Sequence, residues 1–279
     1  MKHVFYSSRT GKKRELKGIP LIKLKEMFLR QYELFNKDGY FDESFGSHCV
    51  DSGDKPGTLG DVEFEILVKI QKSNLWPLDR NIVRYSEDDL FDIIEFLYLH
   101  VSKPIDGYLH NFGGCGMHWN KFDQQGGQKG FREKINQLLG LYERPFELSE
   151  AGEILQKAEE GFEPIFEAKV PSSDDSVTSR ITSAISQFRR HGASLDDRRH
   201  AVRDLADILE WLKPKLTALI TSKDEGDLFN IANNFGIRHH NDKQKTNYDT
   251  ALWLSWMFYF YLATIHLVLR KMEKAGKTS

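Results

Sequence analysis

The stretch that decides the fold is Asp224–Arg270, which reads DEGDLFNIANNFGIRHHNDKQKTNYDTALWLSWMFYFYLATIHLVLR. It places a dense polar cluster, Arg238–Asp242, between two apolar helical patterns. The second pattern, Ala251–Leu269, holds no Asp, Glu, Lys or Arg and is the most hydrophobic segment of the chain. It predicts a helix buried inside a bundle, with the polar cluster at the turn that enters it.

Ala251–Leu269 is also about as long as a membrane-spanning helix, and Arg270 and Lys271 follow it. Its Trp and Tyr residues, however, lie in its N-terminal half and middle rather than only at its edges, and His266 would sit in hydrocarbon. These features favour a bundle helix, and a tail anchor is kept as the alternative.

Composition limits the class of protein. A chain of 279 residues is long enough for two domains, and a formal net charge of −2 gives no global electrostatic attraction to nucleic acid. Two cysteines are too few for a disulfide framework, and the chain opens without an apolar signal segment. We therefore expect a cytoplasmic protein whose binding site for any polyanion is local.

A composition shift at residues 170–173 predicts a domain boundary, with an N-terminal domain over 1–170 and a C-terminal domain over 171–279. In the second domain, apolar residues at spacings of three and four predict four helices, at about 176–190, 198–220, 226–235 and 248–274. The first three follow a hydroxyl with a carboxylate three positions later, at Ser172, Ser194 and Ser222, which is typical of a helix start. Pro214 is expected to kink or end the second helix. The fold class is therefore mainly α, with a four-helix bundle at the C-terminus.

The first domain is predicted to be mixed and mostly helical. Helical spacing covers about 21–35, 64–76, 86–101 and 131–142, and Ser86 with Asp89 has the form of a capping box. Residues 39–61 and 107–130 are rich in Gly and lack a sustained period, so they are expected to be long loops. Residues 146–170 predict a short extended excursion such as a hairpin.

The two Gly-rich loops carry possible metal ligands. His48 and Cys49 lie in the first loop, and His110, Cys115 and His118 lie in the second. Imidazole nitrogen and thiolate sulfur are the ligands of tetrahedral zinc sites, but the spacing matches no standard zinc pattern closely. Each loop could instead pack tightly around an aromatic side chain, and both alternatives stay open.

The four helices and the Arg–His cluster that leads into the last of them resemble the HEPN superfamily of small helical bundles. Many members are metal-independent ribonucleases of abortive-infection and toxin systems, and their sites usually form at a dimer interface. The family signature is an Arg, a polar residue, and a His four to six positions after the Arg. Arg238 and His239 match the first two positions. The later positions hold Lys243, Gln244 and Lys245, and His240 lies nearer than the family pattern has it.

The resemblance implies an endoribonuclease that needs no metal or other cofactor. Arg238 would stabilise the charge of the phosphorane, because its fork of donors matches phosphate oxygens. His239 or His240 would transfer protons, since the pKa of imidazole lies near neutrality. Asn241 would orient the scissile group. Two further residues, Lys243 and Lys245, would hold flanking phosphates of the RNA.

The resemblance also implies a homodimer that acts as a phage-defence or toxin-type effector, with the N-terminal domain as the sensor or recognition part. A partner defence or antitoxin protein is a further expectation. The alternative function is a non-catalytic bundle that dimerises and binds RNA or a protein. The cluster would then cap the third helix and form ion pairs with Asp242 and Asp249. Elsewhere, His200 and Arg203 are expected on a solvated face, and His266 is expected to be buried with its polar atoms satisfied.

Overall fold

A computed structural model describes residues 6–11, 18–158, 161–172, 174–216 and 249–276 of the chain. The protein is mainly α-helical and divides into two compact units, Met1–Ile154 and Leu155–Ser279. The division lies upstream of the boundary that the sequence predicts at residue 170, because Ile165, Phe166 and Val170 pack on the core of the second unit.

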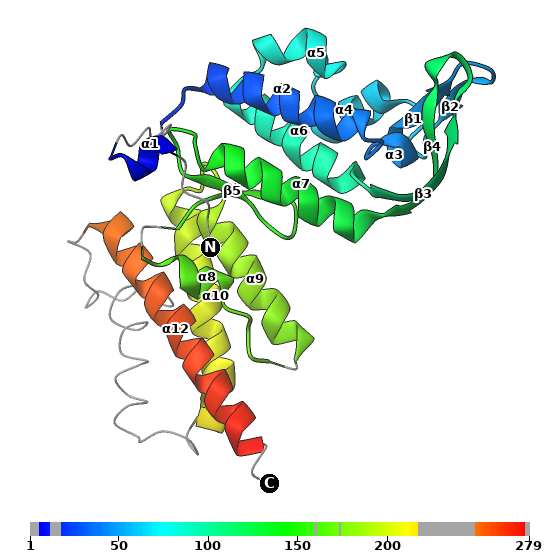
Figure 1. Cartoon of the computed structure of the whole chain (residues 1–279). Helices are drawn as coiled ribbons and strands as arrows, with labels where there is room; N and C mark the ends of the chain where they lie inside the picture. The colour runs from blue at the N-terminus through cyan, green and yellow to red at the C-terminus, as the bar shows by residue number, and fades with distance from the viewer. Residues whose placement is uncertain (1–5, 12–17, 159–160, 173, 217–248, 277–279) are drawn as a thin grey trace. The chain divides into compact units, whose positions relative to one another are not determined.

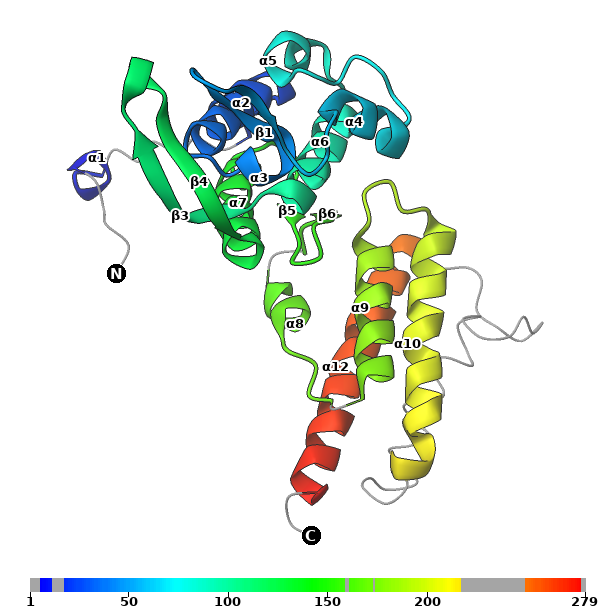
Figure 2. The same ribbon diagram turned by 90° about the vertical axis from the view of Figure 1, so that its right-hand side faces the viewer.

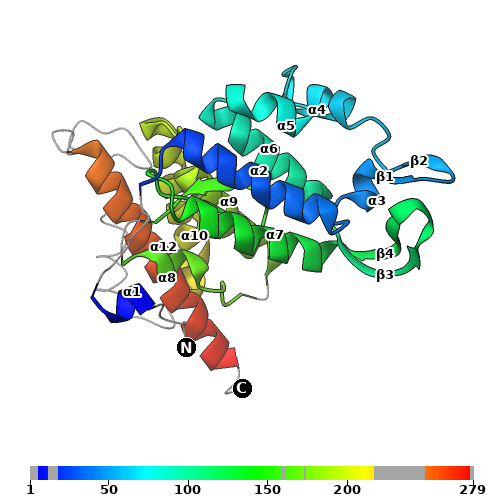
Figure 3. The same ribbon diagram turned by 45° about the horizontal axis from the view of Figure 1, so that its top comes forward.

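The first unit combines helices with three small two-stranded sheets. Its helices are α1 (Tyr6–Arg9), α2 (Leu21–Lys37), α3 (Asp42–Phe45), α4 (Val62–Ile70), α5 (Leu78–Asn81), η1 (Ile82–Arg84), α6 (Glu87–His100), η2 (Phe112–Gly114) and α7 (Gln124–Leu139). Its strands are β1 (Gly46–Cys49), β2 (Gly53–Pro56), β3 (Lys103–His110), β4 (Gly116–Asp123), β5 (Phe146–Leu148) and β6 (Ile154–Gln156), which begins at the last residue of the first unit and crosses the division. Helices α2, α6 and α7 lie alongside one another, and β1 to β4 gather at one end of them (Figures 1 and 3).

Helix α6 is the centre of this unit. Eight of its 14 residues are buried, and they include Leu90, Ile93 and Leu97 with no exposed surface. Apolar side chains on nearly every face mark a helix that is surrounded by others. Phe28 of α2 and Phe131 of α7 are fully buried in the same core.

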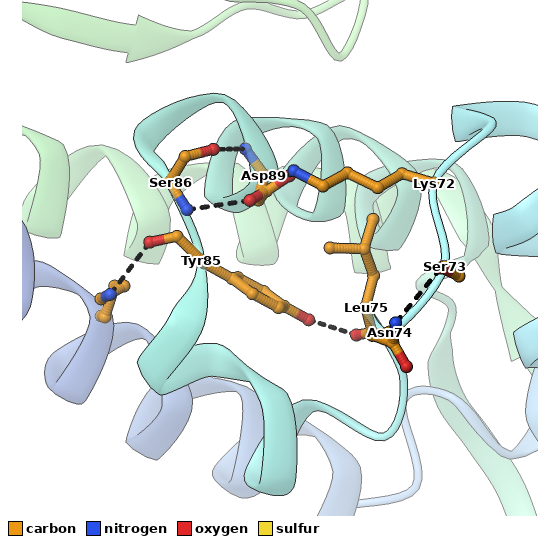
Figure 4. A network of polar contacts seen from close by, with 8 residues as sticks. Lys72, Ser73, Asn74, Leu75, Tyr85, Ser86 and Asp89 are labelled. Atoms are coloured by element: carbon orange, nitrogen blue, oxygen red, sulfur yellow. Dashed lines mark hydrogen bonds and ion pairs between the residues drawn. The ribbon is translucent and has the colours of Figure 1, made fainter.

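The start of α6 is fixed by a polar network around Asp89 (Figure 4). Ser86 Oγ accepts from the Asp89 N–H at 3.2 Å, and Asp89 Oδ2 accepts from the Ser86 N–H at 2.8 Å, which confirms the predicted capping box. The Lys72 ammonium donates to the other carboxylate oxygen of Asp89, and the Tyr85 hydroxyl donates to the Leu75 carbonyl. Burial alone would raise the pKa of Asp89, but the bonds from Lys72 and Ser86 hold it below its ordinary value.

Two segments that the sequence predicts to be loops are β-hairpins. Strands β1 and β2 pair antiparallel from Gly46↔Pro56 to Cys49↔Gly53, and β3 and β4 pair from Lys103↔Asp123 to His110↔Gly116. We call these two hairpins the ribbons. Helix α7 also begins earlier than expected, because Asp123 accepts from the Gly126 N–H at 3.0 Å and caps it. The excursion over 146–170 contains the predicted extended pair, β5 with β6, and then α8 (Glu163–Glu167).

The second unit is helical in its described part, with α8, α9 (Asp175–Arg189), α10 (Leu195–Leu216) and α12 (Thr250–Gly276). Helix α10 packs against both α9 and α12, and Figure 2 shows the three side by side. Phe188 of α9 stacks on Phe258 of α12 with ring centroids 4.0 Å apart. The predicted helix over 226–235, which would be the fourth member of the bundle, lies outside the described residues.

The helix starts of the second unit follow the sequence only in part. Ser194 and Asp197 exchange the expected capping bonds, but α9 is capped by Asp174, whose carboxylate accepts from the Ser176 N–H at 2.9 Å. The prediction that Ser172 caps α9 is therefore wrong, and the Ser172 hydroxyl accepts from the Asp174 N–H instead. Pro214 does not end α10, which continues to Leu216.

Helix α12 is half buried rather than enclosed on all sides. Its inner face includes Phe258, Leu262 and Ile265 with no exposed surface, whereas Leu252 is 67% exposed and Leu267 is 55% exposed. Within the described residues it is the helix long and apolar enough to cross a membrane, and 56% of its apolar window is buried inside the protein, as in a core helix.

The prediction that His266 is satisfied is wrong. His266 is buried on α12, but neither ring nitrogen has a hydrogen-bond partner among the described residues, and burial lowers its pKa. His200 is exposed, as expected, and Arg203 is half buried.

The Asp89 network gives a first prediction. In Asp89→Ala the Ser86 N–H loses its acceptor, and the cost to the stability of α6 should be about 1–3 kcal/mol. Native-state hydrogen exchange of the α6 amides measures this change in opening free energy. Asp88→Ala removes the same charge from an exposed position in the same turn and should cost less than about 0.5 kcal/mol. Equal costs in the two variants would contradict the role of the network.

Candidate metal centre

Four potential metal ligands converge where the two ribbons meet. They are Cys49 at the end of β1, His110 at the end of β3, Cys115 in the β3–β4 connection and His118 in β4. One ligand atom from each lies within 4.8 Å of all the others. We call these four residues the ligand cluster.

Local backbone geometry brings the cluster together. The short connection from β3 to β4 contains Gly113 and Gly114, and β4 begins at Gly116; these three glycines have φ values of 59°, 73° and 96°. Glycine adopts positive φ without the steric cost that other residues bear. The turn thereby places Cys115 beside His118, with Cys115 Sγ 3.1 Å from His118 Nε2. Cys49 Sγ of the other ribbon lies 3.9 Å from His110 Nδ1.

The buried residues of the ribbon strands are both members of the ligand cluster. Along β1, β2, β3 and β4, every residue is half buried or exposed except Cys49 and His118. Apolar strand residues such as Ile105, Leu109 and Met117 are instead exposed. A two-stranded ribbon is only marginally stable without a face to bury, so these ribbons depend on something other than an apolar core.

The surroundings of the cluster suit ligands in their deprotonated forms. Burial, with the neighbouring charges of Lys55 and His110, lowers the pKa of His118. Hydrogen bonds from Ser52 lower the pKa of the Cys49 thiol to about 6. The Lys55 ammonium lies 3.4 Å from His118 Nδ1. Neutral imidazole and thiolate are the forms that bind a metal ion.

A carboxylate stands behind one of the ligands. Asp51 Oδ2 lies 3.1 Å from His110 Nε2, while the other ring nitrogen of His110 faces the cluster. Metal-binding histidines usually donate their second N–H to such a group, which fixes the tautomer and ring orientation. Asp51 was not predicted as a site residue, and its position two residues after Cys49 is the signal in the sequence that points to it.

The fifth residue of the sequence hypothesis, His48, lies outside the cluster. Successive side chains of a strand point to opposite faces, so His48 turns away when Cys49 turns inward. Its Nδ1 pairs with Asp54 Oδ1 at 2.8 Å, and both side chains are exposed.

The alternative for the Gly-rich segments, close packing around an aromatic side chain, also occurs. A Cβ added to Gly39 would lie 2.3 Å from Nε1 of Trp119, and one added to Gly107 would lie 2.9 Å from Cε3 of the same ring. The indole therefore fits where these glycines leave room. It is a neighbour of the ligand cluster rather than a substitute for it, since Trp119 directly follows His118 in β4.

The other predicted site lies outside the described residues. It comprises Arg238, His239, His240, Asn241, Lys243 and Lys245, together with Asp242. Asp249, the other acid considered as an ion-pair partner, is described. Its carboxylate accepts from the N–H groups of Ala251 and Leu252 at 3.1 and 3.2 Å and caps α12.

Comparisons with family models, with curated proteins and with solved structures find no match to this chain.

The contact between Asp51 and His110 gives a second prediction. Replacing Asp51 with Asn removes the charge behind His110 and should weaken zinc binding by about 10- to 100-fold. A competition titration against a chromogenic chelator measures this. Asp54→Asn is the matched control, because Asp54 pairs with His48, which lies outside the cluster, and it should leave zinc affinity within about twofold of the unaltered protein. A larger loss in Asp54→Asn than in Asp51→Asn would contradict the assignment.

Proposed function

We propose that the first unit binds one zinc ion through Cys49, His110, Cys115 and His118, and that the ion holds the two ribbons together. The observation that carries this proposal is that the buried positions of the ribbons are ligand positions. A bound ion would supply the stability that an apolar core supplies elsewhere.

The donor set favours zinc over other common ions. Two thiolates and two imidazoles form the Cys₂His₂ set of closed structural zinc sites, whereas Mg²⁺ and Ca²⁺ prefer oxygen ligands. Zn–S bonds of about 2.3 Å and Zn–N bonds of about 2.0 Å put tetrahedral ligand atoms roughly 3.3–3.8 Å apart. The ligand atoms of the cluster all lie within 4.8 Å of one another, and two of the pairs are 3.1 and 3.9 Å apart, so shifts of about 1 Å or less reach that geometry.

The zinc proposal gives a third prediction. The protein purified with zinc should contain one equivalent by elemental analysis, and a strong chelator should remove it. His110→Ala leaves only three ligands, so zinc affinity should fall by more than about 100-fold. Loss of the ion should raise hydrogen exchange in the ribbons, because their tether is gone.

His48→Ala is the matched control for that experiment. It removes an imidazole from the same ribbon, one position from Cys49, but takes nothing from the cluster. Its zinc content should equal that of the unaltered protein. A protein that holds no zinc, or one in which His48→Ala loses zinc as readily as His110→Ala, would rule the proposal out.

A second candidate function concerns the C-terminal unit. We propose that its bundle is a HEPN-like, metal-independent endoribonuclease, with Arg238 stabilising the phosphorane and His239 or His240 transferring protons. The proposal is supported by the resemblance of the Arg238–His239 segment to the family signature and by the helical character of the described second unit. The last helix, α12, begins just after this segment and is capped by Asp249, whose Oδ1 accepts from two backbone N–H groups.

In this proposal the protein is a cytoplasmic phage-defence or toxin-type effector that acts as a homodimer. Its first unit would be the sensor or recognition part, and a partner defence or antitoxin protein would restrain it. The alternative is a non-catalytic bundle that dimerises and binds RNA or protein. Both share the helical second unit and differ only in whether the polar cluster performs chemistry.

The nuclease proposal gives a fourth prediction. Expression of the unaltered protein should be toxic and cleave cellular RNA, and both effects should disappear in Arg238→Ala and in a His239/His240 double alanine variant. Loss of an essential charge-stabilising or proton-transfer group costs about 10²-fold or more in rate. Circular dichroism of each variant verifies that the bundle is intact. Toxicity that persists in folded variants would favour the non-catalytic alternative.

A further inference from the structure

The two cysteines of the chain are brought together by the fold. Cys49 and Cys115 are 66 positions apart and are the two cysteines in the sequence. Both belong to the ligand cluster, so their sulfur atoms are separated by no more than 4.8 Å. A disulfide requires about 2 Å between the sulfurs, and the remaining gap is within the reach of side-chain rotation and small movements of a ribbon.

The Cys115 side chain is accessible to small reagents. Cys115 is half buried, and its neighbours Gly114 and Gly116 have empty space where a side chain would lie. Cys49 is buried, and its sulfur lies within 4.8 Å of the Cys115 sulfur. One sulfur is thus accessible for attack on an oxidant, and a second, buried sulfur lies close enough to resolve the product.

We propose that the ligand cluster is an oxidation-sensitive switch, in which hydrogen peroxide converts the two zinc-bound thiolates to a Cys49–Cys115 disulfide and zinc is released. This inference rests on the proposed zinc site. Its two histidines, His110 and His118, cannot hold the ion alone, because structural zinc sites use four protein ligands.

The chemical steps balance with peroxide as the oxidant. The Cys115 thiolate attacks one oxygen of hydrogen peroxide, the O–O bond breaks, and a sulfenic acid and hydroxide form. The Cys49 thiolate then attacks the sulfenic sulfur, the S–S bond forms, and a second hydroxide leaves. Two protons from solvent convert both hydroxides to water. The cysteine pair loses two electrons, peroxide gains them, and Zn²⁺ departs without a change of oxidation state.

Oxidation and chelation both remove the zinc ion, but they produce different forms of the protein. The disulfide joins the same two ribbons as the metal ion, so the oxidised form stays tethered while His110 and His118 become free. Chelation under reducing conditions removes the tether altogether. Ribbon hydrogen exchange should therefore be slow in the zinc form, intermediate in the oxidised form and fastest in the reduced, zinc-free form.

The test uses the full chain loaded with one equivalent of zinc. Hydrogen peroxide should release that equivalent, measured with a chromogenic chelator, and yield a Cys49–Cys115 cross-linked peptide in a non-reducing digest. A thiol reductant with added zinc should restore the starting form. His48→Ala should respond like the unaltered protein. Cys115→His keeps four ligands and one thiolate, so it should bind zinc but form no intramolecular disulfide.

The outcomes separate the two proposals. A chain that never binds zinc removes the zinc proposal and this switch with it. A zinc-loaded chain that keeps both its metal and its thiols in peroxide overturns the switch alone. Release of zinc with sulfinic acid, and without the cross-link, also overturns the switch.

Discussion

The two ribbons of the first unit bury no apolar face. Because strands without such a face are only marginally stable, the ribbons need another interaction to hold them in place. The helical core around α6 is complete without the ribbons, because its buried residues come from helices, connecting segments and the short β5–β6 pair. Apart from Trp119, whose indole lies against Gly39, the ribbons therefore gain little from that core. In the proposed zinc site, four side chains would bind one ion and so provide the missing restraint at a point where both hairpins meet.

The same need explains why the cluster takes its residues from both ribbons. Cys49 contributes from one ribbon, and His110, Cys115 and His118 contribute from the other. A site within one hairpin would stabilise only that hairpin. Ligands from both restrict the position of one ribbon against the other, and Asp51 on the turn of the first ribbon reaches His110 on the second. The restraint thus extends beyond the ligands to the carboxylate behind them.

The sequence predicted most helices because their signals are local. Apolar spacing marks α2, α6 and α10, and the Ser86–Asp89 capping box marks the start of α6. The ribbons were missed because a half-buried strand is identified by alternation of apolar and polar residues. Strand β3 buries no residue on either face, so the alternation is absent from KPIDGYLH. The candidate ligands were identified by residue type, but choosing Cys49 over His48 required the strand that sets their directions.

Losing the link between the ribbons and losing the packing of α6 would affect the first unit differently. Loss of α6 packing would unfold the first unit, because Leu90, Ile93 and Leu97 are fully buried within it. Loss of the tether between the ribbons would release strands whose residues, apart from Cys49 and His118, are already half buried or exposed, at little cost to the helices. Local opening of this kind has a lower free energy than global unfolding, and regions that respond to ligands belong to that class. Binding or loss of the proposed ion would therefore change the state of the ribbons while the helical core stays folded.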